Sequence, residues 1–189
     1  MRDYRFWKII FDFTLASILI LFLFPILLIT CFLVYLDIGS PIIFKQIRVG
    51  QYGDNFVIYK FCTINPNQRT ISNIGRFLRK SKLDEFPQLF NILKGDMSFV
   101  GPRPDIPGYY DILEGDDRKV LQLKPGLTSE ASIKYRNEEE LLERVENPLS
   151  YNDEILFPDK VKMNKKYLQK MSFFKDLKIL FKTVKSILS

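Results

Sequence analysis

The feature that most constrains this 189-residue chain is an uncharged run near its N-terminus. From Phe13 to Leu36 there are 24 residues without a charged side chain. A helix rises about 1.5 Å per residue, so a straight helix of this length could cross a bilayer. The run is too long for a signal peptide, and a Gly39-Ser40-Pro41 turn follows it instead of a cleavage site. We therefore predict that residues 1–38 form a membrane anchor.

Two features favour an anchor that enters one leaflet and returns. Pro25 lies near the middle of the run, and because it lacks an N–H and its ring crowds the preceding turn, it should interrupt the helix. Basic residues stand on both sides of the run: Arg2, Arg5, Lys8, Lys45 and Arg48. Since basic flanks mark the cytoplasmic side, both ends are predicted to be cytoplasmic, which fits a re-entrant helix-break-helix. A spanning helix kinked at Pro25 is the alternative.

Residues 39–189 are predicted to form one cytoplasmic catalytic domain of the α+β class, mostly helical. Two short β-rich segments, 42–44 and 55–61, flank a turn that contains Gly50 and Gly53, which predicts a small β-hairpin. Apolar spacing predicts a helix around residues 71–78. A second helix is expected from about Asp84 to Lys94, before Gly95.

Positive charge is concentrated at the C-terminal end. The formal net charge of the chain is +6, and residues 160–189 carry nine lysines and one acidic residue. Apolar residues recur there at three- and four-residue spacing, which predicts one basic amphipathic surface helix over about 160–189. At an anionic leaflet each lysine contributes about 1 kcal/mol. An ordinary surface helix is the alternative, and nucleic-acid binding is not favoured because no recognition motif is present.

The reactive side chains are limited in kind. The chain has no histidine, which excludes histidine triads and histidine metal sites. Its two cysteines, Cys31 and Cys62, cannot form a zinc-thiolate cage. Chemistry must therefore come from carboxylates, cations, hydroxyls or a metal held by oxygen atoms.

The densest polar cluster surrounds Asp84. If Asp84 caps the helix that follows, Pro87 falls in the first turn, where its missing N–H is harmless. The helix dipole and the neighbouring cations, Arg79 among them, should then keep Asp84 anionic, as suits a nucleophile. Glu85 could orient Asp84 or handle a proton. The alternative is that Asp84 is only a helix cap.

Other charged residues suggest phosphate chemistry. Arg103 lies between two prolines, so its backbone should be rigid and its guanidinium a good phosphate clamp, although a solvent-facing arginine in a structural turn is the alternative. Lys60 ends a predicted strand, and Asp159 stands at a probable helix start. Cations and isolated carboxylates without histidine suggest phosphoryl transfer, with Mg²⁺ bridging substrate phosphates.

The order of several motifs resembles a known family, the small monotopic phosphoglycosyl transferases, or bacterial sugar transferases. The motifs follow the hydrophobic N-terminus and cover nearly the whole chain. They are Phe44-x-Gln46-x-Arg48-Val49-Gly50, Lys60-Phe61-Cys62-Thr63, Gly75-Arg76-Phe77-Leu78-Arg79-Lys80, Leu83-Asp84-Glu85-x-Pro87-Gln88-Leu89, the run from Gly95 to Pro104, and Pro125-Gly126-Leu127-Thr128.

The resemblance implies an enzyme on the cytoplasmic face of a bacterial inner membrane. Such enzymes transfer a sugar-1-phosphate from a UDP-sugar to undecaprenyl phosphate, as the first membrane step of a glycan pathway, and release UMP. It implies that Asp84 attacks the β-phosphorus to form a phospho-aspartyl intermediate, that Glu85 is its partner, and that Mg²⁺ sits against Asp84. Lys60, Arg79, Arg103 and Asp159 match other active-site positions, and Arg136 matches a nucleotide contact. Neither the motifs nor the resemblance decides whether the protein forms a homodimer.

Two departures from the family pattern leave an alternative open. Cys62 replaces a usual arginine, and Ser129-Glu130 introduces an acid near the presumed nucleotide pocket. A catalytically silent membrane adaptor of the same fold, which would recruit glycan-assembly enzymes, is therefore the main alternative. A lipid-binding protein without enzyme activity is disfavoured, because lipid binding does not need the motifs between Arg79 and Pro104.

Overall fold

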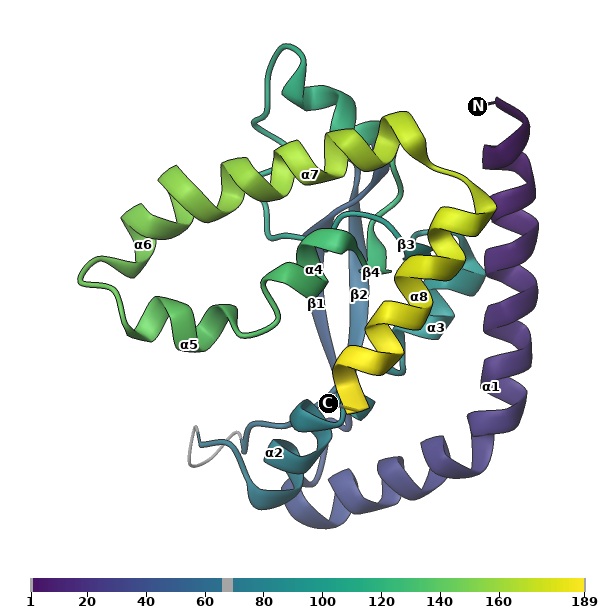
Figure 1. Cartoon of the computed structure of the whole chain (residues 1–189). Helices are drawn as coiled ribbons and strands as arrows, with labels where there is room; N and C mark the ends of the chain where they lie inside the picture. Colours follow the sequence, from purple (N-terminus) through teal and green to yellow (C-terminus); the bar gives the residue numbers. More distant parts are fainter. Residues whose placement is uncertain (1, 66–69, 189) are drawn as a thin grey trace.

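The computed structural model describes residues 2–65 and 70–188, and it begins with one long helix. Helix α1 (Arg2–Ile38) has 37 residues and contains Pro25. Figure 1 shows that α1 runs along one side of the molecule and changes direction in its C-terminal part. The predicted helix-break-helix is thus wrong in one respect: the helix bends, but it continues through Pro25, where only one backbone donor is missing.

Most of the large apolar side chains of α1 are exposed. Phe22 and Leu21 are 75% and 74% exposed, and Phe6, Trp7 and Phe32 are also exposed. By length and composition, Tyr4–Ile38 could cross a membrane. Such a surface is unfavourable in water, which agrees with the prediction of an anchor.

The predicted hairpin is confirmed. Strands β1 (Ile43–Val49) and β2 (Asn55–Phe61) pair antiparallel, with Phe44 opposite Lys60. A short 3₁₀ turn, Gln51–Gly53, joins them. At Gly53 the backbone φ is +93°, a conformation that glycine adopts without strain.

The segment after the hairpin differs from its prediction. Helix α2 (Asn73–Lys80) is capped by Ser72, and a 3₁₀ turn at Leu83–Glu85 precedes helix α3 (Gln88–Lys94). Asp84 therefore lies inside a 3₁₀ turn and is not a helix cap as predicted. Pro87 explains the difference, because it has no N–H to bond the Leu83 carbonyl, and the Phe86 N–H bonds that carbonyl at 3.2 Å instead.

A second, parallel pair of strands was not predicted. Strands β3 (Ser98–Val100) and β4 (Gly126–Thr128) pair next to a close backbone crossing. A Cβ added at Gly101 would lie 2.2 Å from the Lys124 carbonyl oxygen, and one at Gly126 would lie 2.1 Å from the Gly101 nitrogen. Both positions need glycine, so this crossing holds the loop that follows β3 in a fixed place.

The other regular elements of the described chain are helical, and loops connect them. A 3₁₀ segment spans Asp117–Gln122, and the helices are α4 (Glu130–Lys134), α5 (Glu138–Glu143), α6 (Pro148–Tyr151), α7 (Phe157–Lys170) and α8 (Phe173–Leu188). The single amphipathic helix predicted over about 160–189 is therefore two helices, which separate at Met171, where the backbone is extended.

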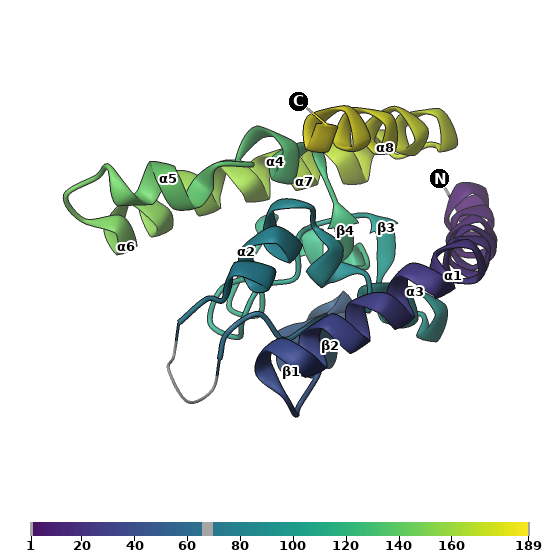
Figure 2. The same ribbon diagram turned by 90° about the horizontal axis from the view of Figure 1, so that it is seen from below.

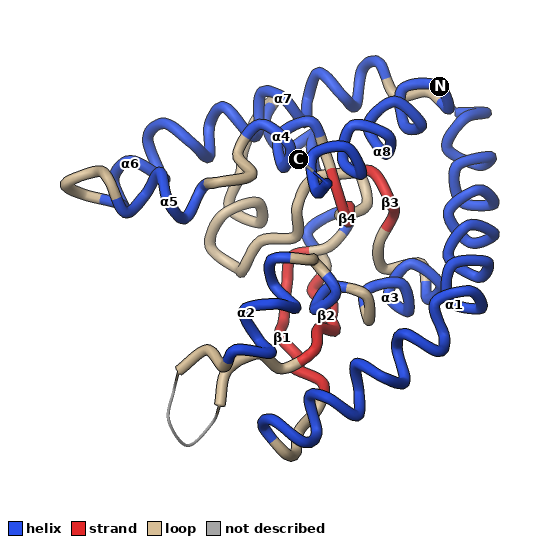
Figure 3. Tube along the Cα trace, turned by 60° about the horizontal axis from the view of Figure 1, so that its bottom comes forward, coloured by secondary structure: helices blue, strands red, loops and turns tan. Residues whose placement is uncertain are grey.

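The layers place the short strands between helices. Figure 2 shows α7 and α8 on one side of strands β3 and β4, and α1 with the β1–β2 hairpin on the other side. Figure 3 gives the same arrangement, with α5 and α6 projecting away from the centre. The largest buried cluster joins α1, β2, α3, β3, α7 and α8, so the N-terminal and C-terminal helices share one core.

Candidate active site

The Asp84–Glu85 pair is buried at the centre of a charged cluster. Both residues lie in the 3₁₀ turn between α2 and α3, and each is 8% exposed. The turn lies against strand β2, which supplies Lys60. Two adjacent carboxylates in one buried turn experience different neighbours, and this difference separates their chemistry.

Glu85 is the carboxylate with strong partners. Its Oε1 accepts a hydrogen bond from Lys60 Nζ at 3.1 Å and another from Arg103 Nη2 at 2.9 Å. Burial opposes ionisation of Glu85, but Arg103, Lys60 and Lys82 outweigh burial and lower its pKa to about 2. Glu85 is therefore a fixed negative charge that orients two cations.

Asp84 is the carboxylate without a partner. Its Oδ1 atom is buried and has no hydrogen-bond partner among the described residues. Burial and the charge of Glu85 raise its pKa, while Lys60, Lys82 and Arg79 oppose that rise. The neighbouring cations favour the anionic form of Asp84 as expected, but burial outweighs them, so the net shift of its pKa is upwards. A buried, unpaired oxygen among cations is a site for an incoming cationic or phosphorus centre.

Arg79 and Arg103 approach this turn from two directions. Arg79, near the end of α2, donates from Nε to Thr63 Oγ1 at 2.9 Å, and Thr63 is buried. Arg103 follows β3 by three residues, and Glu85 raises its pKa most, with a smaller contribution from Glu138. Because the side chain of Arg103 is 50% exposed, its guanidinium can meet a ligand while it holds Glu85.

The structure thus brings five of the predicted residues together: Lys60, Arg79, Asp84, Glu85 and Arg103. Lys82 adds a sixth member that the site prediction did not include. It precedes the 3₁₀ turn with a left-handed backbone, φ 58°. Its place in the basic run before Asp84 was the signal that could have identified it.

Asp159 belongs to a neighbouring cluster. Its Oδ2 accepts from Lys134 Nζ at 2.6 Å and from the Tyr135 hydroxyl at 2.7 Å, and these contacts lower its pKa. In residues 2–65 and 70–188, no hydrogen bond or ion pair joins Asp159 to Asp84 or Glu85. Arg136 is also apart from that pair, and its Nη1 donates to Ser186 in α8 at 3.3 Å.

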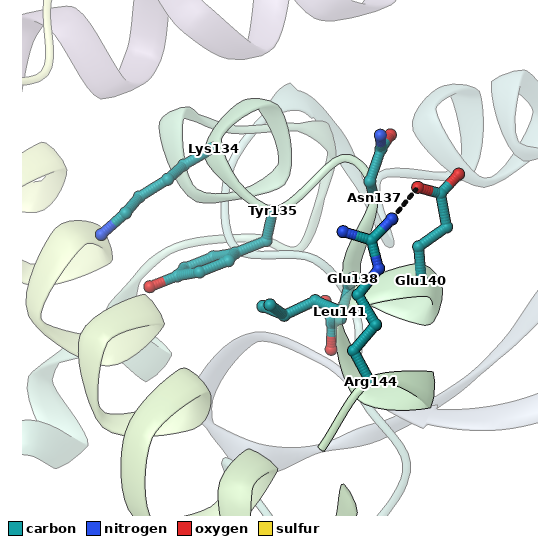
Figure 4. A pocket seen from close by; sticks show the side chains of 7 residues that line it. All are labelled: Lys134, Tyr135, Asn137, Glu138, Glu140, Leu141 and Arg144. Atoms are coloured by element: carbon teal, nitrogen blue, oxygen red, sulfur yellow. Dashed lines mark ion pairs between the residues drawn. The ribbon is translucent and has the colours of Figure 1, made fainter.

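A pocket of about 250 Å³ lies beside Asp159. Figure 4 shows Tyr135 and Leu141 projecting towards one space, with the Arg144 guanidinium directed at Glu140. The seven lining residues are Lys134, Tyr135, Asn137, Glu138, Glu140, Leu141 and Arg144. Glu138 connects this pocket with the first cluster, since it bonds Lys160 at 2.6 Å and contributes to the field at Arg103.

The two departures from the family pattern each have contacts within the fold. Cys62 packs with an apolar cluster that includes Val34, Phe61 and Leu78, and burial raises its pKa. Glu130 bonds Lys175 of α8 at 3.1 Å. Both side chains thus have structural contacts, which weakens the case that they disable the site.

The residues around Asp84 fit a metal that takes few protein ligands. In the part of the chain that is described, no group of three or more histidine, cysteine or acidic side chains could hold a metal. Mg²⁺, however, is typically bound by one or two carboxylates together with substrate phosphates and water. The unpaired Asp84 Oδ1 has the chemistry that such a ligand needs.

Comparison with known proteins places the chain among sugar transferases. The chain is 37% identical over 191 residues to the "Uncharacterized sugar transferase EpsL" of Bacillus subtilis, covering 96% of this chain and 87% of that protein. It is 30% identical to the "Undecaprenyl-phosphate galactose phosphotransferase" of Salmonella typhimurium, with coverage of 99% and 41%. It is 31% identical to the "UDP-glucose:undecaprenyl-phosphate glucose-1-phosphate transferase" of Caulobacter vibrioides, with coverage of 96% and 70%.

The chain therefore spans less than half of the Salmonella protein but most of the Bacillus one. The family model described as "Bacterial sugar transferase" matches residues 3–189, almost the full length. The chain belongs to the bacterial sugar transferase family, which confirms the resemblance and the prediction of a transferase enzyme.

Proposed function

We propose that the protein transfers a sugar-1-phosphate from a UDP-sugar to undecaprenyl phosphate, giving undecaprenyl-diphosphate sugar and UMP. The names of the Salmonella and Caulobacter relatives support both substrates. The observation that carries the proposal is the unpaired, buried Oδ1 of Asp84 beside a carboxylate that holds Lys60 and Arg103. This arrangement joins a nucleophile to cations that can bind a diphosphate.

The reaction proceeds in two displacements. In the first, the ionised Asp84 carboxylate attacks the β-phosphorus of the UDP-sugar, the bond from that phosphorus to the bridging oxygen breaks, and UMP leaves with the bond electrons. In the second, a phosphate oxygen of undecaprenyl phosphate attacks the same phosphorus and releases Asp84. Asp84 attacks as the carboxylate: burial and Glu85 disfavour that form, and Lys60, Lys82 and Arg79 favour it.

Glu85 acts through the cations that it holds. Since its pKa is about 2, it is a poor proton donor near neutral pH. Its contribution is to fix Lys60 and Arg103 where the phosphate oxygens bind, without reorganisation during the reaction. Lys82 and Arg79 add positive charge near Asp84.

Asp84 would hold Mg²⁺ together with the substrate phosphates. When bound, Mg²⁺ supplies Lewis-acid neutralisation of the diphosphate charge. The orphaned Oδ1 supports this role because a buried carboxylate oxygen without a donor is otherwise unfavourable.

The nucleotide is proposed to extend from Arg103 towards the pocket beside Asp159. Glu138 lines this pocket, bonds Lys160 and acts on the field at Arg103, and Arg136 of the same segment bonds Ser186 of α8. Asp159 already orders Lys134 and Tyr135 at the pocket, so it would position those two groups for the nucleotide.

The membrane places the lipid phosphate at this site. We propose that α1 enters the cytoplasmic leaflet of a bacterial inner membrane and returns, with Pro25 at the bend. In α8 the side chains of Phe174 and Phe181 are 81% and 72% exposed, which adds a second apolar surface, and Lys178 and Lys182 flank it. Such a helix suits the headgroup region of an anionic leaflet.

Release of UMP tests the proposed reaction. Purified protein in nanodiscs, with Mg²⁺ and undecaprenyl phosphate, would be given a panel of UDP-sugars. We expect release with one or a few donors and none with Asp84→Asn, whose lipid binding should be unchanged. Folded, membrane-inserted protein that releases no UMP with any donor would instead support the silent adaptor.

A further inference from the structure

A buried charged cluster joins α1 to the two C-terminal helices. Asp176 of α8 is fully buried, and three donors surround it: Tyr4 at 2.6 Å, Lys8 at 2.5 Å and Tyr167 at 2.5 Å. Lys8 also lies 3.8 Å from Asp12, which is 5% exposed. We call these five residues the anchor cluster. None of them belongs to the site around Asp84.

Stability alone is a weak reason for such a cluster. Removing two opposite charges from water is costly, and apolar replacements of buried ion pairs are often neutral or stabilising. A buried network with most partners satisfied does, however, fix one arrangement of the segments that it joins. The function of the anchor cluster therefore depends on which segments it holds in place.

The anchor cluster reaches the backbone of strand β3. The Phe99 N–H donates to Asp12 Oδ1 at 3.3 Å. The Tyr167 hydroxyl lies 3.4 Å from the Val100 carbonyl oxygen while it bonds Asp176. The Phe99 amide of β3 is thus bonded from α1, and the Tyr167 hydroxyl of α7 lies beside the carbonyl of the next residue.

Strand β3 leads directly to the arginine of the active site. Val100 is followed by the close backbone crossing at Gly101, and Arg103 comes two residues later and donates to Glu85 at 2.9 Å. Because the crossing leaves no space for a Cβ, a displacement of β3 must move this loop. We propose that Asp12, Tyr167 and Asp176 are positioning residues that set Arg103 against Glu85, so that the docking of α1 determines the geometry of the phosphate site.

A double-mutant cycle tests this proposal, with UMP release as its activity readout, which rests on the proposed function. Asp12→Leu is similar in size and removes the acceptor of the Phe99 N–H. We expect it to lower kcat/KM at least about tenfold in the wild-type background. In the Arg103→Lys background, where the guanidinium fork is already lost, the same change should lower kcat/KM less than about threefold. Equal losses in both backgrounds would overturn the proposal.

Hydrogen exchange gives a second readout that does not need turnover. In Asp12→Leu we expect faster exchange at the Gly101 and Gly126 amides, which bond the Thr128 and Pro102 carbonyls, beyond the amide that lost its acceptor. A change confined to Phe99 would contradict positioning. If the wild-type protein releases no UMP, the proposed function fails, while exchange still decides this inference.

Two further variants complete the design. Thr30→Val is the matched control, because Thr30 is a buried polar residue of α1 whose hydroxyl donates to the Ile26 carbonyl of its own helix, at 2.8 Å. It should change neither kcat/KM nor exchange in the loop. If Asp12→Leu does not fold, Tyr167→Phe replaces it in the same cycle, with the same criterion.

Discussion

Adjacent buried carboxylates with opposite pKa shifts should respond oppositely to loss of charge. Glu85→Gln and Asp84→Asn each keep the size of the side chain and remove its charge. At about pH 7 we expect Glu85→Gln to lower the free energy of unfolding, because it leaves Lys60 and Arg103 without their shared acceptor charge. We expect Asp84→Asn to leave that free energy unchanged or to raise it, because burial and Glu85 disfavour the charged form.

The magnitude for Glu85 follows from its pKa. The shift from 4.5 to about 2 corresponds to roughly 3 kcal/mol at about 1.4 kcal/mol per unit. Solvent reaches half of the Arg103 side chain and screens its interaction, so a loss of about 1–3 kcal/mol is expected. For a chain of this size, that lowers Tm by about 2–12 °C.

The pH dependence has a definite sign for each group. The pKa of Glu85 is depressed by folding, so its contribution is fully present above about pH 4.5 and is lost as the pH falls towards about 2. The pKa of Asp84 is raised, so its contribution is present below its ordinary pKa and is lost as the pH rises through the raised value.

Thermal unfolding followed by far-UV circular dichroism in detergent measures these differences. Glu140→Gln is the matched control, because Glu140 also faces an arginine, Arg144 at 4.0 Å, but both side chains are mostly exposed. Its Tm should be unchanged. The reasoning is refuted if Glu85→Gln and Glu140→Gln have the same Tm, or if Asp84→Asn lowers Tm as much as Glu85→Gln does.

Three other predictions concern turnover. Because Asp84 must be ionised to attack, UMP release should fall in acid, and the fall should begin at a pH above the ordinary aspartate pKa. Glu85→Gln removes a negative charge beside Asp84, so it should move this fall to lower pH. A profile that does not move contradicts the effect of Glu85 on the pKa of Asp84. Chelation by EDTA should abolish UMP release and added Mg²⁺ should restore it, whereas an unchanged rate excludes the metal role. Cys62→Arg should leave kcat within about twofold and lower Tm, because it places a charge in an apolar cluster. Cys62→Val is the control. A several-fold gain in kcat would show that the arginine usual at this position in the family supports catalysis.

The sequence correctly predicted the β-hairpin and the cations around Asp84. The hairpin follows from two β-rich segments around glycine turns, and it forms with Phe44 opposite Lys60. The cations around Asp84 were also predicted, since Lys60, Arg79 and Arg103 carry recognisable motifs. The motif order, however, identified the family more specifically than any single contact.

One local effect of Pro87 and several tertiary features were not predicted. Pro87 was assigned to a helix turn that begins at Asp84, but the missing N–H shifts the preceding bonds to a 3₁₀ pattern. The parallel β3–β4 pair depends on residues far apart in the chain, so no short pattern indicates it. The raised pKa of Asp84 depends on burial, which neighbouring charges in the sequence do not reveal.

The central claim is that Asp84 carries the sugar phosphate between donor and lipid. The most direct measurement is the intact mass of the protein after incubation with Mg²⁺ and the UDP-sugar that supports UMP release, without undecaprenyl phosphate. The account predicts added mass equal to one phosphosugar, absent from Asp84→Asn and discharged when undecaprenyl phosphate is added. Turnover of the same donor without any adduct under single-turnover conditions, or an adduct that persists in Asp84→Asn, would contradict it.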